Sequence, residues 1–228
     1  MKTLQTWFNK PLLTVLLFSI MGFASSCSKD DDTSANGTAN VMIVNSVEGS
    51  TAQDFYLDDA KVNSQAVASG QTNGYFTVNA GNHKADFKSS NSATVNATSN
   101  LNFQSGKYYT IYYTGSSSSG STFTTEDDLT TPAANMVKVR FVHLSSAAAS
   151  AIDVGVTGGT KLVTSLVYKT ASAYYSVAPL TNFQVFAAGS ATSSLTLGNL
   201  GLQAGKIYTV YVSGNTTATI TYRVIVNN

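Results

Sequence analysis

The stretch Asn199–Gly214, which reads NLGLQAGKIYTVYVSG, occurs a second time at Asn100–Gly115 as NLNFQSGKYYTIYYTG. Nine of the sixteen positions are identical, and the two copies lie 99 residues apart. This spacing is too long for a solenoid repeat and suits a small β-domain. The sequence therefore predicts two tandem modules.

Each copy places a glycine (Gly106 or Gly205) three residues before a tyrosine (Tyr109 or Tyr208) that opens an alternating apolar run. The pattern resembles the tyrosine corner of immunoglobulin-like sandwiches, in which the phenol hydroxyl bonds to backbone just upstream. The glycine permits the chain to bend there. We therefore assign Tyr109 and Tyr208 a structural role.

Beyond the corner, successive side chains of a strand point to opposite faces. Tyr109 and Tyr208 are on the face predicted to be core, whereas Tyr108, Tyr112 and Tyr211 take the other face. Exposed aromatic rings can stack on sugars or anchor a protein partner, so these three tyrosines are the candidate contact residues. Tyrosine also favours strands on its own account, which leaves a purely structural interpretation open.

The N-terminus has the pattern of a secretory signal peptide. Basic residues (Lys2, Lys10) precede an apolar run at 12–23, which is too short for a membrane span and is followed by the small residues 24–26. The sole cysteine, Cys27, comes next, so no intramolecular disulfide can form. This ending resembles a bacterial lipobox and predicts cleavage after residue 26 with lipidation of Cys27; a soluble secreted protein with a stray thiol is the alternative.

A short charged segment follows the cysteine. It comprises Lys29, Asp30, Asp31 and Asp32, with Ser28 before it, and resembles the surface-export tag of certain Gram-negative lipoproteins. The expected location is the outer membrane, lipid-anchored and exposed at the cell surface. A plain solvated tether, continuing to residue 39, is the other interpretation.

Composition narrows the classes of partner. Removing residues 1–26 takes away two of the 13 basic residues and none of the 12 acidic ones, which leaves a formal net charge of −1. Only 11% of residues are charged, and no basic cluster is present. Phosphate binding needs clustered Lys and Arg, so nucleic acid is not expected as a partner.

Both halves of the chain show short alternating strands separated by turn signals, and neither shows helical periodicity. This pattern predicts an all-β protein of two tandem immunoglobulin-like (fibronectin- or transthyretin-like) β-sandwich modules. We place the first module at residues 40–132 and the second at 133–228. About 95 residues suffice for an independent core.

Three segments carry a family resemblance. They are VKVRFVHLSSAAASAIDVGVTGGTKL (Val137–Leu162), the strand at Tyr174–Tyr175, and LQAGKIYTVYVSG (Leu202–Gly214). They resemble the domain of unknown function 4397. The resemblance covers the second module well and the first more loosely, since Tyr56 stands near the place of Asp153. It implies an extracytoplasmic protein, often a lipoprotein, with no established activity and no functional residues to carry over.

The chain offers little material for catalysis. Its two histidines, His83 and His143, lie in different modules, and no catalytic motif is recognisable. We therefore expect no enzymatic activity and no cofactor. The acidic run Glu126, Asp127 and Asp128 is a weak calcium candidate because hard oxygen ligands cluster there. Without a specific ligand spacing, solvated turn carboxylates are the favoured interpretation.

Together these features predict a non-catalytic cell-surface lipoprotein that serves as a binding or adhesion module for an extracellular glycan or protein. The alternative is a structural accessory subunit of an outer-membrane complex or fibre. An aromatic-lined groove would favour the first, and a contiguous exposed apolar patch the second.

Overall fold

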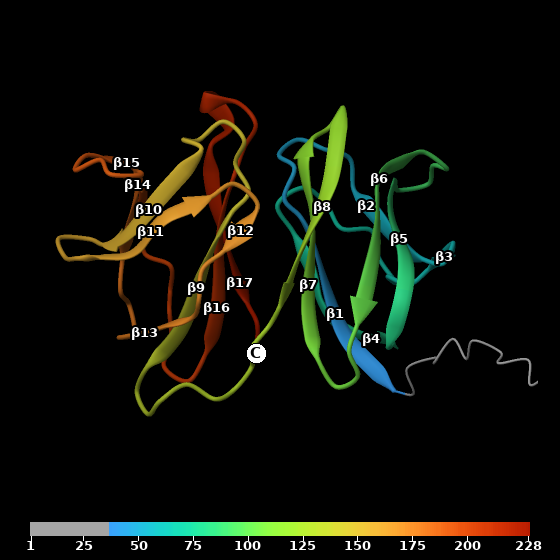
Figure 1. The fold of residues 1–228 in the computed structure, drawn as a ribbon, viewed down its shortest axis with the longest axis horizontal. Coiled ribbons are helices and arrows are strands. Elements are labelled where there is room, and N and C mark those ends of the chain that lie inside the picture. Colours follow the sequence, from blue (N-terminus) through green and yellow to red (C-terminus); the bar gives the residue numbers. More distant parts are fainter. Residues whose placement is uncertain (1–36) are drawn as a thin grey trace, which may run out of the picture. The chain divides into compact units, whose positions relative to one another are not determined.

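The structure is a computed structural model that describes residues 37–228, coloured from blue to red in Figure 1. The described residues form one compact unit. The described residues form seventeen β-strands and one short 3-10 turn, η1 (Thr217–Thr219), and contain no α-helix. The predicted all-β fold class is therefore confirmed. No helix of the described part is long and apolar enough to span a membrane.

Residues 38–126 form two four-stranded sheets. The first inner sheet has the order β4-β1-β7-β8, with bounds β1 (Thr38–Asn45), β4 (Thr72–Asn79), β7 (Tyr108–Ser116) and β8 (Ser119–Glu126). The first outer sheet has the order β3-β2-β5-β6, with bounds β2 (Gln53–Leu57), β3 (Ala60–Lys61), β5 (Gly81–Ser89) and β6 (Val95–Phe103). Since β1 begins at Thr38, the last two residues of the expected tether belong to a strand instead.

Residues 137–226 repeat this plan. The second inner sheet has the order β12-β9-β16-β17, and β13 also pairs with β9; the bounds are β9 (Val137–His143), β12 (Thr170–Ala171), β13 (Tyr175–Val177), β16 (Ile207–Ser213) and β17 (Thr221–Val226). The second outer sheet has the order β11-β10-β14-β15, with bounds β10 (Ala151–Val156), β11 (Lys161–Val167), β14 (Phe183–Ala187) and β15 (Ser193–Leu197).

Both inner sheets contain one parallel pair, β1 with β7 and β9 with β16, and the other pairs are antiparallel. When β12 and β13, which both pair with β9, are counted as one strand, the strand orders within each half are 4-1-7-8 and 3-2-5-6. Immunoglobulin constant domains have the orders ABED and CFG, in which the first strand lies beside the second. The two halves therefore share one topology, and it differs from the immunoglobulin order.

The repeated stretch forms the same corner in both halves. The Tyr208 hydroxyl accepts a hydrogen bond of 3.1 Å from the backbone N–H of Gln203, and the Tyr109 hydroxyl accepts one of 3.1 Å from Gln104. The preceding glycines have φ angles of 76° and 77°, which side chains with a Cβ rarely adopt. Each tyrosine thus satisfies a backbone donor at the bend, as the sequence pattern predicts.

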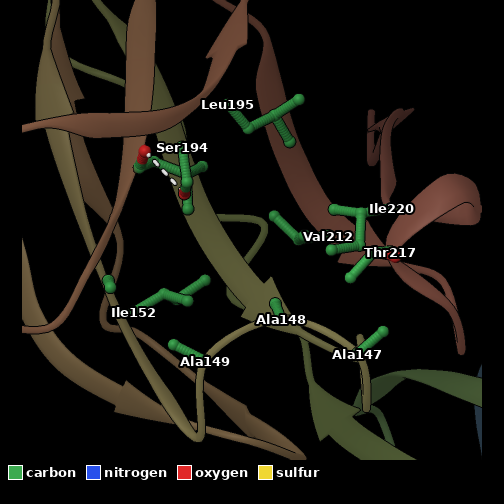
Figure 2. A pocket seen from close by; sticks show the side chains of 11 residues that line it. Ala147, Ala148, Ala149, Ile152, Ser194, Leu195, Val212, Thr217 and Ile220 are labelled. Atoms are coloured by element: carbon green, nitrogen blue, oxygen red, sulfur yellow. Dashed lines mark hydrogen bonds between the residues drawn. The ribbon is translucent and has the colours of Figure 1, made fainter.

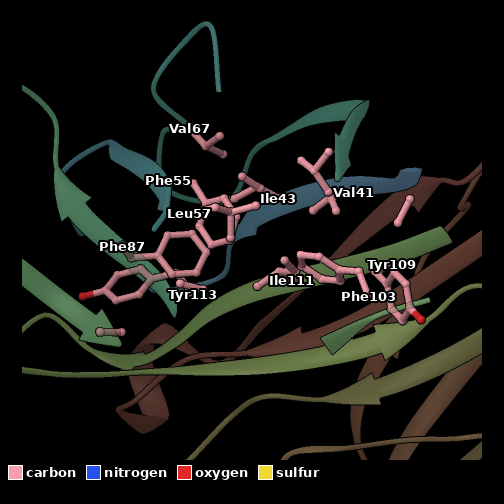
Figure 3. Packing of buried hydrophobic residues seen from close by; sticks show 14 of the residues in the cluster. Val41, Ile43, Phe55, Leu57, Val67, Phe87, Phe103, Tyr109, Ile111 and Tyr113 are labelled. Carbon is pink, nitrogen blue, oxygen red and sulfur yellow. The ribbon is translucent and has the colours of Figure 1, made fainter. Parts of the chain in front are cut away.

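A core fills the space between the two sheets of each half. In the first sandwich, Phe55 and Phe87 pack with ring centroids 4.9 Å apart, and Phe87 lies 5.5 Å from Tyr113 (Figure 3). The core of the second sandwich is mostly aliphatic, with Phe141 and Phe183 as its aromatic pair at 5.0 Å. Both corner tyrosines belong to these cores, so the predicted core face is confirmed.

A third apolar cluster joins the two inner sheets. It consists of Met42, Val44, Tyr112, Val142, Leu144, Tyr211 and Ile225. Tyr112 and Tyr211 are 0% and 1% exposed, and their rings meet edge to face at 6.0 Å. The expectation that these two tyrosines face solvent is therefore wrong, because the face opposite each core is covered by the other sandwich.

The Tyr208 and Tyr211 hydroxyls differ in a way that mutation can test. Tyr208→Phe leaves the Gln203 N–H without its partner and should lower the free energy of unfolding by about 1–3 kcal/mol. The Tyr211 hydroxyl is buried and has no hydrogen-bond partner among the described residues, so Tyr211→Phe should leave the stability unchanged or raise it. Denaturant unfolding of residues 33–228 measures both. A larger loss for Tyr211→Phe than for Tyr208→Phe would contradict this assignment.

Candidate functional site

The second sandwich has an apolar pocket of about 280 Å³ at the end where β9 leads into β10 (Figure 2). Its walls come from both sheets of that sandwich, from the loop after β9 and from η1. The lining consists of small and aliphatic side chains with two hydroxyls: Ala147, Ala148, Ala149, Ile152, Val185, Ala187, Ser194, Leu195, Val212, Thr217 and Ile220. The lining contains no charged side chain and no aromatic ring.

Three consecutive alanines keep the mouth of this pocket open, and one serine fixes their loop. The Ser145 hydroxyl donates to the Gly214 carbonyl at 2.8 Å and accepts from the Ala148 N–H at 3.1 Å. The loop is thereby tied to the end of β16. Small side chains on a tethered loop leave a space that larger ones would fill.

His143 lies at the base of the same loop. It is fully buried, and its Nε2 lies 3.0 Å from the Ala149 carbonyl oxygen. Because a carbonyl only accepts, Nε2 carries the proton in the neutral ring. Burial lowers the pKa of His143 below its ordinary value. A neutral, buried histidine that supports a loop fits a packing role.

The pocket can bind an apolar group, but its lining offers no base and no metal ligand. Ser194, one of its two hydroxyl residues, donates to the Val185 carbonyl at 3.2 Å. Across residues 37–228, no three His, Cys, Asp or Glu side chains gather closely enough to hold a metal ion.

The three candidate contact tyrosines do not form a site. Tyr112 and Tyr211 lie in the cluster between the inner sheets. Tyr108 is half-buried and packs edge-on against Tyr75 at 5.2 Å. Strand alternation placed all three on one face correctly, but that face is not a binding surface.

The acidic run after β8 has a different role from the calcium site considered above. Asp127 is buried and forms an ion pair with Arg140. It also accepts hydrogen bonds of 2.6 Å from the hydroxyls of Tyr75 and Thr110. Arg140 in turn donates to Thr209 at 2.9 Å. The Asp127 carboxylate is thus enclosed by donors from both sandwiches.

The other two carboxylates of this run face separate cations. Glu126 pairs with Lys107 at 2.7 Å, and Asp128 pairs with Lys138 at 2.5 Å. Hydrogen bonds from Lys138 and Thr130 lower the pKa of Asp128 to about 2. The calcium interpretation is therefore wrong, because each carboxylate is already neutralised by a basic side chain.

The remaining predicted sites concern the N-terminus. The lipidation residue, Cys27, and the export tag at Lys29, Asp30, Asp31 and Asp32 lie outside the described residues.

The family assignment can now be made. The model of the domain of unknown function DUF4397 matches residues 39–155, just over half of the chain. The chain belongs to this family. The match begins in β1 and ends in β10, so it does not lie mainly in the second module, as the sequence resemblance suggested.

More distant similarities are weak. The chain is similar to the Bacillus anthracis TIE protein at 10% identity and a TM-score of 0.26, covering 78% of this chain and 34% of that one. It is also similar to CBMbc (family CBM26) from Eubacterium rectale Amy13K, in complex with maltoheptaose, at 12% identity and a TM-score of 0.26, covering 82% and 96%. The chain thus spans about a third of the Bacillus protein. No curated protein matches the chain. Similarities at this level do not indicate a shared function.

Equivalent positions of the two sandwiches also correct one detail of the sequence interpretation. Buried Asp54 pairs with Lys61, and buried Asp153 pairs with Lys161, each at 2.7 Å. Asp54 is therefore the counterpart of Asp153, and Tyr56 is not.

The residues that line the pocket of the second sandwich were not identified from the sequence, because alanines carry no chemical signature. The one available signal was the run of three alanines, Ala147, Ala148 and Ala149, in the loop after β9.

Removal of the Arg140 guanidinium should destabilise the protein strongly. Arg140→Leu leaves the Asp127 carboxylate buried without its cation, and breaking a buried pair in this way costs about 3–5 kcal/mol. Lys138→Met is the matched control, since its partner Asp128 is about half exposed and such pairs contribute at most about 1 kcal/mol. Denaturant unfolding should separate the two variants. Equal losses would contradict the enclosed position of Asp127.

Stability should fall in mild acid because of His143. Its pKa is lower in the folded state than in the unfolded chain, so the unfolded chain binds the proton first. The free energy of unfolding should therefore decrease as the pH drops below about 6.5. Asn45 pairs with Tyr113 in the first sandwich as His143 pairs with Val212 in the second, so Asn45 is the counterpart of His143. The fold thus already holds an asparagine at this position, and His143→Asn is the variant to test. Urea unfolding across this pH range should lose that slope in His143→Asn; an unchanged slope would assign it to another group.

Proposed function

We propose that this chain is a non-catalytic, lipid-anchored binding module of the cell surface, and that the pocket of the second sandwich holds an apolar side chain of an extracellular protein partner. The observation that carries the proposal is the open space between the two sheets, bounded by the alanine loop. Binding pockets are concave and mostly apolar, with few polar groups. This pocket has that character.

The lining favours a protein partner over a glycan for this pocket. Sugar hydroxyls need many hydrogen-bonding partners, whereas these walls are aliphatic, as Ile152, Val212 and Ile220 illustrate (Figure 2). The volume of about 280 Å³ lies just below the range of pockets for drug-sized ligands, roughly 300–1,000 Å³. One aliphatic or aromatic side chain is the ligand that fits this size and polarity.

Contacts between the two sandwiches support a preformed site. Glu48 of the first sandwich accepts a hydrogen bond of 3.0 Å from Ser213 and pairs with Arg223 at 3.1 Å, both in the second. The second inner sheet, which carries Val212, is therefore held on both faces. A rigid pocket loses little conformational entropy when a partner binds.

The anchoring part of the proposal rests on the sequence. Cys27 follows an apolar run and three small residues, and several acyl chains on one cysteine would hold the protein at a membrane stably. The charged residues 29–32 support export to the cell surface. The absence of a recognisable catalytic motif supports a non-enzymatic role.

Closing the pocket should abolish partner binding without affecting the fold. Ala149 is exposed at the mouth, so Ala149→Trp should fill the opening. Ala218→Trp is the matched control, because Ala218 is also exposed and lies next to Thr217 without lining the pocket. Selection of a random-peptide library on residues 33–228 should enrich peptides that share an apolar residue, and these should bind wild type and Ala218→Trp but not Ala149→Trp. Peptides that bind Ala149→Trp equally well would contradict the pocket assignment, and failure to enrich any peptide would favour the accessory-subunit alternative.

Lipid anchoring has a direct test in the whole chain. Cys27→Ala removes the acceptor thiol, so the protein should be released from the membrane fraction of the producing bacterium. Fractionation after a high-salt wash measures this. A variant that still sediments with the outer membrane would contradict the anchor.

A further inference from the structure

The first sandwich has a pocket of its own at the equivalent place, with a volume of about 230 Å³. It lies at the end where β1 leads into β2, between the two sheets. The lining consists almost entirely of neutral polar residues: Gly49, Ser50, Thr51, Gln53, Ser89, Asn96, Tyr113 and Ser117. No charged side chain takes part.

Strand pairing shows that the two pockets are counterparts. Tyr113 pairs with the last residue of β1 as Val212 pairs with the last residue of β9. Likewise, Gln53 pairs with Ser89 as Ile152 pairs with Ala187. The second sandwich thus folds with aliphatic side chains at these positions, so the fold itself does not require polar ones.

The polar side chains of the first pocket are held in place by one another. The Asn96 amide donates to the Gln53 side-chain oxygen at 2.7 Å and to the Ser89 hydroxyl at 2.9 Å. Gln53 is only 1% exposed, and its amide donates to the Thr51 carbonyl at 2.8 Å. The wall is therefore ordered before any ligand arrives, which reduces the cost of binding.

Tyr113 supplies a free polar group to this wall. Its ring is packed in the core against Phe87, and the residue is 1% exposed. Its hydroxyl points away from the other core side chains (Figure 3) and is hydrogen-bonded to no other described residue. Burial raises the pKa of Tyr113, so the hydroxyl stays protonated and can both donate and accept.

We infer that this pocket of the first sandwich binds one neutral saccharide residue. Sugar hydroxyls both donate and accept, and they match a wall of amides and hydroxyls without charge. Charged ligands find no counter-ion among the lining residues. The volume limits the ligand to a single ring. This inference concerns a different pocket and a different ligand from the proposed function, so either can fail without the other.

Ligand-detected NMR on residues 33–228 tests the inference, because this unit contains every strand and all three apolar clusters of the described part of the chain. The probes are neutral monosaccharides, each as the free sugar and as its methyl glycoside. We expect at least one to bind, and Tyr113→Phe to weaken its affinity about tenfold or more while the melting temperature stays unchanged. Binding of the methyl glycoside would indicate the end of a glycan, and binding of the reducing sugar alone would indicate a free sugar.

Two further variants keep the test decisive. Asn96→Ala removes a second polar group from the wall and should also weaken binding, which covers the case in which Tyr113→Phe fails to fold. Ser194→Ala alters the second pocket and should leave saccharide affinity unchanged. The inference is overturned if none of the sugars binds wild type, if folded Tyr113→Phe and Asn96→Ala bind like wild type, or if Ser194→Ala removes the binding.

Discussion

The buried ion pair between Asp127 and Arg140 is the constraint on which the arrangement of the two sandwiches depends. A carboxylate withdrawn from water must be surrounded by donors, and these come from Tyr75 and Thr110 on one side and from Arg140 on the other. Replacing such a pair with apolar residues is often neutral for stability, so its main contribution is to geometry. The linker that follows β8 is thereby fixed at its first residues, and the two inner sheets are held together over their apolar faces.

This constraint also determines which surfaces of the two sandwiches are covered. The outward faces of both inner sheets pack against each other, and two of the three predicted contact tyrosines, Tyr112 and Tyr211, are buried between them. Each sandwich keeps a pocket at its end, between its two sheets. There the two copies of one topology differ in a few residues: Tyr113 and Gln53 in one correspond to Val212 and Ile152 in the other.

The sequence carried enough information to predict the repeat, the corners and the core faces, because each depends on local spacing. Gly205 and Tyr208 are three residues apart in any context, and alternation then determines which side chains share a face. Alternation does not say what covers a face, which is why the burial of Tyr211 was not foreseen. The partner of Asp127 could not be inferred either, since Arg140 lies beyond the linker, in β9. The pockets depend on the distance between two sheets, and no local pattern encodes that.

The contact between Tyr112 and Tyr211 has an implication for the origin of the chain. These two residues occupy the same position of the repeated stretch, so each sandwich meets its own counterpart across the interface. Self-matching of this kind defines an isologous interface, the kind found in twofold-symmetric dimers. The chain can thus be viewed as a homodimer whose subunits have become covalently joined. In a true homodimer both pockets would have to change together, whereas duplication within one chain frees each pocket to acquire its own chemistry.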